Sequence, residues 1–510
     1  MTDESIVEGR AHSGDLSLDA DVVVVGSGAG GAVVAAELAE AGQRVVILEE
    51  GPHVPPERYS RMRPSENMRH MWRDGGLTFA VGLGDTPVIN VMMGQCVGGS
   101  SVLTGGVCFR IPDSVMHEWV TEHGLDDINP KRMEPVFEEV ERRIHVEEVP
   151  ASMRSRSTQH FLNGLDALGL GWQPMRRNTK GCNGCGRCNF GCPHGAKLSV
   201  DVSYLPRAFA AGARLYSDCR VEQVTSKSGR ANGVTGRLLG GAGRKPRGRL
   251  TVRARRVVVA AGAYASPLLL MQSGVGRRSG QVGRNLTVHP GFRVMARFKD
   301  PVQGWKGALQ SAYSDAFERD RITMTSLFIP PGALAGTLPG IGLAHQRVAE
   351  SIPNLAVFGG MIHDEGGGRI HQVFGRTLMT YRMAPKDRAA IPVLMRGMAE
   401  VFFAGGAEEV FLPVLGLGSV DRDRLARIDL EHVPATALES ASQHPLGTCR
   451  MGVAPHGSVV DPFGQAWDLP ELYVADGSIL PTSLGVNPQL SIMSMALRIA
   501  WHLREKKLPS

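Results

Sequence analysis

The stretch Asp21-Val-Val-Val-Val-Gly26-Ser-Gly28-Ala-Gly-Gly31 decides the fold of this chain. An apolar strand that runs into three spaced glycines, followed by a helix over 32–41, predicts a dinucleotide-binding turn. Gly26 permits the turn, Gly28 lets a pyrophosphate approach the backbone, and Gly31 lets the helix pack closely on the strand. The N-terminus of that helix then faces the phosphates.

A second apolar strand, 45–48, follows the helix and ends at Glu49. Glu49 lies 23 residues beyond Gly26, close to the spacing expected for an acid that accepts a hydrogen bond from a ribose hydroxyl. Glu50 is the neighbouring alternative. The complete unit of strand, turn, helix and strand predicts a dinucleotide site in an α/β fold, but it does not separate NAD from FAD.

The composition narrows the class of protein. Of the 510 residues, 43% are apolar and 21% are charged, and the chain has 63 glycines and 31 prolines. These values exclude a disordered chain or a fibre and indicate a globular protein with many tight turns. The net charge of +6 is small for this length, so we expect no nucleic-acid partner. The N-terminal residues lack an export signal, and glycines interrupt the apolar stretch 22–39, so we expect no transmembrane segment and a cytoplasmic location.

Three further stretches, far apart along the chain, have the character of strand-to-loop junctions. Residues 94–106 form a glycine-rich loop that suits backbone wrapping around a flat cofactor. Apolar strands at 257–261 and 472–475 end at Gly262 and Asp476. Taken singly, each stretch is compatible with an ordinary junction.

Taken together, the order of these motifs resembles the glucose-methanol-choline (GMC) family of FAD oxidoreductases. The resemblance covers most of the chain and rests on GSGAGG at 26–31 with Glu49, GGSS at 98–101, AAGAYASPLLLMQSG at 260–274, VGRNLTVHP at 282–290, QHPLGTCRMG at 443–452 and VADGSILPTSLGVNPQLSIM at 474–493. Within the family, the pair Asn487-Pro488 is similar to the cholesterol oxidases and bacterial alcohol dehydrogenases, because the glucose oxidase branch has a second histidine there.

The resemblance implies a Rossmann-like FAD-binding domain that is discontinuous, built from 1–291 and 440–510 with a cysteine-rich insert at 181–196. It leaves 292–439 as an α+β substrate-binding domain. The resemblance also assigns FAD contacts to Gly26, Gly28, Gly31, Glu49, Gly98, Gly99, Ser100, Thr104, Val221, Gly262, Asp476, Gly477 and Pro488.

One of these contacts departs from the family pattern: Thr104 stands where many relatives have asparagine. That difference changes the flavin contact expected at this position. In the substrate-binding domain, the patterns predict strands at 293–298 and 321–329 and a helix at 386–405.

The candidate reacting groups follow from the chemistry. Oxidation of an alcohol by hydride transfer needs a hydride acceptor, which FAD supplies at N5, a group that takes the hydroxyl proton, and a group that orients the oxygen. His444 is the candidate general base, because imidazole titrates near neutral pH. The resemblance implies that Asn487, 43 residues later, meets the same substrate oxygen. His289 also lies in a family motif, and we expect it to pack near the cofactor.

Four of the eight cysteines lie within eleven residues: Cys182, Cys185, Cys188 and Cys192. Their C-x2-C-x2-C-x3-C-P spacing matches the bacterial ferredoxin run and predicts an iron-sulfur cluster. The spacing leaves three arrangements open: Cys192 closes a [4Fe-4S] site, a distant cysteine does so, or three cysteines hold a [3Fe-4S] cluster. A structural zinc and free thiols are the alternatives.

Some dehydrogenases of the family resemble this chain in carrying such an insert, and there it holds an iron-sulfur cluster. The implied activity is an FAD-dependent dehydrogenase that oxidises a small-molecule alcohol and passes electrons through the cluster to an external acceptor. The resemblance to sterol and long-chain alcohol enzymes favours a hydrophobic alcohol. Two alternatives stay open: an oxidase that reduces O2 to H2O2, and a non-catalytic flavin-binding or electron-transfer protein.

Overall fold

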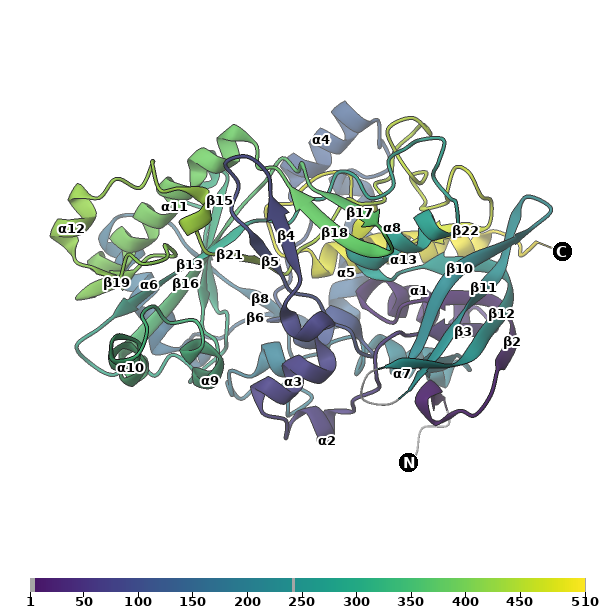
Figure 1. The fold of residues 1–510 in the computed structure, drawn as a ribbon, viewed down its shortest axis with the longest axis horizontal. Coiled ribbons are helices and arrows are strands. Elements are labelled where there is room, and N and C mark those ends of the chain that lie inside the picture. The colour runs from purple at the N-terminus through teal and green to yellow at the C-terminus, as the bar shows by residue number, and fades with distance from the viewer. Residues whose placement is uncertain (1–4, 241–243, 510) are drawn as a thin grey trace.

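The structure, a computed structural model, describes residues 5–240 and 244–509. It contains two large β-sheets, each with its own hydrophobic core and its own helices (Figure 1). The sheet that includes the N-terminal strands lies on the right of Figure 1, and the sheet built mainly from the middle of the chain lies on the left. The functional residues described below come from the region where the two sheets meet.

The first sheet runs in the order β1 (Ile6–Glu8), β9 (Arg214–Ser217), β3 (Val45–Leu48), β2 (Leu16–Val25), β12 (Lys245–Val259), β11 (Arg230–Gly240) and β10 (Cys219–Lys227), with β22 (Leu472–Val474) also paired to β12. The strands from β1 to β12 and the β12–β22 pair are parallel. The valines that end β2 are buried, as is usual where helices cover a parallel sheet. The predicted strand at 21–25 is the second half of β2, and the helix predicted at 32–41 is α1 (Ala29–Glu40).

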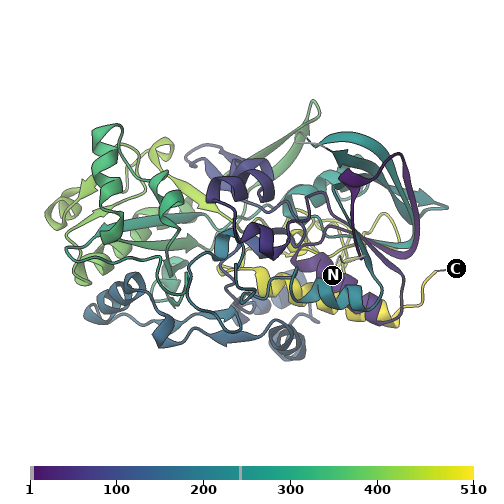
Figure 2. The same ribbon diagram turned by 90° about the horizontal axis from the view of Figure 1, so that it is seen from below.

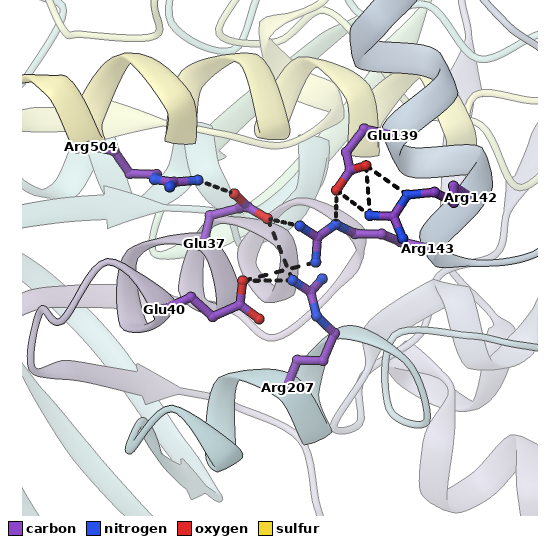
Figure 3. Close-up of polar contacts among 7 residues, drawn as sticks. All are labelled: Glu37, Glu40, Glu139, Arg142, Arg143, Arg207 and Arg504. Atoms are coloured by element: carbon purple, nitrogen blue, oxygen red, sulfur yellow. Dashed lines mark hydrogen bonds and ion pairs between the residues drawn. The ribbon is translucent and has the colours of Figure 1, made fainter.

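Helix α1 packs against α13 (Gln489–Glu505) and α7 (Tyr204–Ala210), and α13 also packs against α5 (Pro130–Arg143). Figure 2 shows α1 and α13 side by side below the first sheet. The buried Glu37 of α1 forms ion pairs with arginines of the other three helices: Arg143 at 3.4 Å, Arg207 at 3.8 Å and Arg504 at 2.9 Å (Figure 3). One carboxylate therefore links four helices.

The second sheet runs in the order β17 (Arg369–Val373), β18 (Arg376–Tyr381), β4 (Phe79–Gly82), β5 (Ile89–Val91), β21 (Ser440–Ser442), β13 (Gly291–Arg297), β16 (Leu355–Ile362), β15 (Ile322–Leu327), β14 (Ala312–Ser314) and β7 (Gln173–Pro174), with β19 (Glu409–Phe411) on β13 and β20 (Ser419–Val420) on β19. Helices α6 (Arg156–Ala167) and α11 (Pro385–Ala404) pack on this sheet. The predicted strands at 293–298 and 321–329 correspond to β13 and β15, and the predicted helix at 386–405 is α11.

The remaining elements are α2 (Pro56–Tyr59), α3 (Pro64–Met71), α4 (Asp113–His123), α8 (Gly262–Gln272), α9 (Pro331–Ala335), α10 (Leu343–Glu350), α12 (Arg422–Arg427) and a ribbon of β6 (Val146–Glu148) with β8 (Arg176–Asn178). Strands β4, β5, β7 and β21 belong to the second sheet although they lie within 1–291 and 440–510. The domain boundaries stay a prediction. In the structure, the second sheet contains strands from both of the predicted domains. No helix within residues 5–240 and 244–509 is long and apolar enough to span a bilayer.

Candidate active site

The glycine turn after β2 owes its shape to close backbone contacts. Gly26 has a φ of +102°, and a Cβ on it would lie 2.3 Å from the carbonyl oxygen of Ala260. A Cβ on Gly31 would lie 2.0 Å from the carbonyl oxygen of Gly26. A Cβ on Gly28, by contrast, would meet only Cα of Gly99 at 3.9 Å within the described residues. The backbone at Gly28 thus faces open space, which fits a pyrophosphate.

Glu49 organises the same turn. One of its carboxylate oxygens accepts hydrogen bonds from the backbone N–H of Ser27 at 3.0 Å and from its hydroxyl at 2.7 Å. The other oxygen accepts from the N–H of Gly51 at 2.8 Å, and burial raises the pKa of Glu49. The hydroxyl of Ser27 also accepts from the N–H of Gly98 at 3.1 Å. Glu49 therefore joins the first glycine turn to the glycine-rich loop.

Glu50, the alternative to Glu49, binds arginine side chains. It forms ion pairs with Arg73 at 2.9 Å and with Arg220 at 2.8 Å. Burial opposes its ionisation, but these two guanidinium groups outweigh burial and lower its pKa to about 2. Glu50 thus holds surrounding segments together, and Glu49 is the acid that faces the turn.

Asp476 links two of the sequence motifs. It accepts hydrogen bonds from the N–H of Gly262 at 2.9 Å, from the hydroxyl of Ser266 at 2.5 Å and from the N–H of Ser478 at 2.8 Å. The carboxylate therefore holds the start of α8 against the loop after β22. Gly477 lies in that loop, and Val221 is half-buried on β10 opposite Gly236.

A cavity of about 660 Å³ opens between strands of the second sheet and the glycine-rich loop. Five of the predicted site residues line it: Ser100, Thr104, His444, Asn487 and Pro488. Other lining residues with polar side chains were not predicted from sequence, among them Asn90, Asn189, Gln310 and Gln489. Gln489 directly follows Asn487-Pro488, so adjacency was a usable signal for it, whereas Asn90 and Gln310 lie in segments without a motif.

His444 and Asn487 meet at the wall of this cavity. The Nε2 atom of His444 lies 3.2 Å from the side-chain nitrogen of Asn487, and the backbone N–H of His444 donates to the hydroxyl of Ser442 at 3.0 Å. Burial, and then the neighbouring ring of His289, lower the pKa of His444 to about 3. His444 is therefore a neutral imidazole at physiological pH. The structure brings the two predicted reacting residues side by side.

The cysteine-rich segment packs against the glycine-rich loop. Cys188 and Cys192 are buried, and Cys182 and Cys185 are partly exposed. The guanidinium of the buried Arg177 donates to Sγ of Cys188 at 2.9 Å and to the carbonyl oxygen of Gly105 at 2.8 Å. Asn189, within the segment, lines the cavity. The segment thus reaches both the loop and the cavity wall.

Lys197 adds a second buried cation beside these thiols. Its ammonium donates to the carbonyl oxygens of Ser101, Val102, Thr104 and Cys188 at 2.7 to 3.1 Å. Burial lowers the pKa of Lys197, whereas the nearby Cys188 and Asp201 favour its charged form. Two buried cations beside thiols suit a ligand set of anionic thiolates. As the described side chains are arranged, however, no three His, Cys, Asp or Glu residues are grouped to hold one metal ion.

The Rossmann-like sheet and the cavity with its paired histidine and amide define the class of protein, a dinucleotide-dependent oxidoreductase. Comparison with known proteins gives the family. The family model described as GMC oxidoreductase matches residues 20–291, and its C-terminal counterpart matches 375–496. The chain belongs to the GMC oxidoreductase family, and it is an FAD-dependent enzyme that acts on the CH–OH group of its donor.

The similar proteins include one named as an oxidase and one named as a dehydrogenase. An uncharacterised GMC-type oxidoreductase of Mycobacterium tuberculosis is 38% identical over 94% of this chain and 75% of its own length. The long-chain-alcohol oxidase FAO1 of Arabidopsis thaliana is 28% identical over 96% of this chain and 67% of its own length. A 2-methyl-1,2-propanediol dehydrogenase of Mycolicibacterium austroafricanum is 28% identical over 94% of each chain.

Solved structures agree on the fold. Pyridoxine 4-oxidase from Mesorbium loti superposes with a TM-score of 0.73 at 18% identity, over 96% of this chain and 99% of that chain. Formate oxidase superposes with a TM-score of 0.74 at 16% identity, over 97% and 99%. The predicted α/β architecture is confirmed.

Proposed function

We propose that this enzyme oxidises an alcohol with a long apolar chain and that the hydroxyl group binds beside His444 and Asn487. The observation that carries the proposal is the position of these two side chains, 3.2 Å apart at the wall of a cavity that the glycine-rich loop also lines. FAD, when bound, supplies N5 as the hydride acceptor. Asn487 orients the oxygen, and His444 contacts the hydroxyl group through Nε2.

The protonation of His444 decides how it does so. A general base, the role predicted from the sequence, must present an unprotonated Nε2 to the hydroxyl. Because the pKa of His444 is lowered to about 3, its ring is neutral, with one nitrogen protonated and the other not. If the proton is on Nδ1, Nε2 of His444 can act as a base. If the proton is on Nε2, that atom can only donate a hydrogen bond.

The apolar character of the substrate is supported by the wall of the cavity. Large apolar side chains line it: Phe79, Val88, Met92, Phe292, Leu327, Ile329, Val357, Leu415 and Ile492. Burial of apolar chain against such a wall contributes roughly 0.8 kcal/mol for each methylene group. A relative named a long-chain-alcohol oxidase points to the same substrate class.

The test is anaerobic mixing of the FAD-loaded enzyme with primary alcohols of increasing length and with a sugar of similar size. The proposal expects bleaching of the oxidised flavin by the alcohols, at concentrations that fall as the chain lengthens. Flavin reduction by the sugar alone, or no dependence on chain length, would overturn the proposed substrate class.

We further propose that Cys182, Cys185, Cys188 and Cys192 hold an iron-sulfur cluster, which accepts single electrons when bound. Support comes from the spacing of the cysteines and from the buried cations Arg177 and Lys197 beside them. Such a cluster makes the enzyme a dehydrogenase that serves an external electron acceptor. Anaerobically purified protein should contain iron and acid-labile sulfide along with FAD. A protein that contains FAD without iron, and that forms H2O2 from alcohols, would instead be an oxidase.

A further inference from the structure

His289 has a fixed pattern of hydrogen bonds. It is buried, and its Nε2 atom lies 3.0 Å from the backbone N–H nitrogen of Leu484 and 3.1 Å from that of Gly485. Both backbone groups are donors only, so Nε2 of His289 must accept and cannot carry a proton. Burial, followed by the nearby His363, lowers the pKa of His289 to about 3, so its ring is neutral. The single ring proton of His289 therefore lies on Nδ1.

That proton points toward His444. The Nδ1 atoms of His289 and His444 lie 3.2 Å apart. Because Nδ1 of His289 is the donor, Nδ1 of His444 must be the acceptor. A neutral ring that is unprotonated at Nδ1 carries its proton at Nε2. The chain of contacts from Leu484 and Gly485 through His289 thus determines the tautomer of His444.

Asn487 lies at the other end of this chain of contacts. The Nε2 atom of His444 faces the amide of Asn487, and the buried amide oxygen has no hydrogen-bond partner among the described residues. The nitrogen and oxygen of an amide exchange places when the group turns by half a rotation. With the oxygen toward His444, it accepts from Nε2–H. The amide of Asn487 is therefore compatible with the tautomer that the contacts of His289 require.

The opposite tautomer is excluded by the backbone. If His444 were unprotonated at Nε2, its Nδ1–H would need an acceptor at Nδ1 of His289, whose proton would then move to Nε2. That proton would point at the N–H groups of Leu484 and Gly485, and two buried donors would lose their acceptor.

The contact between His289 and this backbone is held from outside as well. One oxygen of the buried Asp364 accepts from the backbone N–H of His289 at 3.1 Å and from the hydroxyl of Ser483 at 2.8 Å. The carboxylate therefore holds His289 and the residue before Leu484 in place. The hydroxyl of Tyr381 donates to the other oxygen of Asp364. The Nε2 atom of His363 lies 3.1 Å from the carbonyl oxygen of Ser483. Among the described residues, the contacts of His289 Nε2 are the two backbone N–H groups, and none of these titratable side chains offers it an acceptor.

We propose that His289 is a positioning residue that fixes His444 in the Nε2–H tautomer, so that His444 donates its Nε2–H to the substrate oxygen when the alcohol replaces the amide of Asn487 as its partner. The inference rests on the proposed alcohol oxidation and replaces the general-base role predicted for His444. FAD, when bound, would accept the C–H hydrogen with its electron pair, and a water molecule would take the hydroxyl proton. The N–H of His444 stabilises the negative oxygen formed meanwhile.

Substitutions at His444 separate a donor from a base. The amide of His444→Gln can donate a hydrogen bond but cannot take up a proton, whereas His444→Ala can do neither. A donor role predicts that His444→Gln reduces flavin at least 10-fold faster than His444→Ala. Equal, deeply impaired rates in the two variants would overturn it. His371→Gln, at a partly exposed histidine on β17, serves as the matched control.

A second measurement reads the tautomer without any turnover. Holoenzyme labelled with ¹⁵N-histidine gives separate signals for protonated and unprotonated ring nitrogens, and the spectrum of His444→Gln assigns those of His444. The proposal expects a protonated Nε2 and an unprotonated Nδ1 at neutral pH. The reverse pattern would refute it. This result is independent of the substrate: if no alcohol reduces the flavin, the proposed function fails, while the tautomer is still decided by the spectrum.

Discussion

The hydroxyl of Thr104 donates to the side-chain oxygen of Gln489 at 3.0 Å, which ties the glycine-rich loop to the first turn of α13. Both residues line the active-site cavity. At the position where many relatives carry asparagine, this chain therefore uses a short side chain that binds another protein group. The contact connects two segments, 385 residues apart, that both line the cavity.

Thr104→Val removes that hydrogen bond at nearly constant volume. The oxygen of Gln489 then loses its donor, which we expect to lower the free energy of unfolding by about 1 kcal/mol. Because the contact lies at the cavity, FAD should also bind more weakly. Urea unfolding and the FAD content after dialysis measure the two effects. If the variant retained as much FAD as the wild type, the assignment of Thr104 to the cofactor site would be contradicted.

Substitutions of the glycines in the first turn should have different effects on FAD affinity and on stability. Gly28→Ala has room for its Cβ in the protein, so the apo chain should keep its stability while FAD affinity falls at least about 10-fold, because the Cβ occupies the space of the pyrophosphate. Gly30→Ala places a Cβ 1.8 Å from the carbonyl oxygen of Ala475, so the fold itself should be destabilised. Thermal unfolding of both apo variants, with FAD titration, distinguishes them. Equal loss of stability would contradict the assignment of Gly28 to the cofactor.

Glu50 should stabilise the fold in a defined pH range. Its folded-state pKa, about 2, lies below its ordinary value of 4.5, so its contribution is complete above pH 4.5 and is lost as the pH falls toward 2. The difference in unfolding free energy between the wild type and Glu50→Gln should therefore shrink over this interval. Denaturant unfolding at a series of acid pH values tests it, with the exposed Glu400→Gln as the control. A difference that does not depend on pH would contradict the ion pairs with Arg73 and Arg220.

The arginine-bound Glu37 should matter more than its exposed neighbours. Glu37→Gln leaves Arg143, Arg207 and Arg504 without their shared buried anion (Figure 3) and should cost about 2 kcal/mol, less than a fully buried pair because these arginines are partly exposed. Glu139→Gln, at a partly exposed glutamate of the same network, should cost below about 1 kcal/mol. Denaturant unfolding of both variants gives the comparison, and equal costs would argue against a special role for Glu37.

Local signals made the nucleotide-binding half predictable. The turn from Gly26 to Gly31 and the following helix need only neighbouring residues. In the structure the helix begins three residues earlier than expected and ends one residue earlier, and the strand before the turn ends at Val25 as expected. Gly30 was missed because its reason is tertiary: it allows α1 to approach Ala475, far away in sequence.

The cavity was less predictable for the same physical reason. Asn90 reaches it on β5, a short strand that joins the second sheet through pairing with β4 and β21, and nothing in its neighbours indicates that pairing. His289 was expected only to pack near the cofactor. Its hydrogen bonds to Leu484 and Gly485 depend on loops almost 200 residues away, so no spacing along the chain could give its effect on His444.

The most direct test of the central claim is anaerobic stopped-flow measurement of flavin reduction by a long-chain primary alcohol, in the FAD-loaded wild type and in His444→Ala. The account predicts that FAD stays bound in the variant while the rate of flavin reduction falls by about 100-fold or more, because the polar group at the substrate oxygen is lost. Equal rates in the two proteins would contradict the placement of the alcohol beside His444.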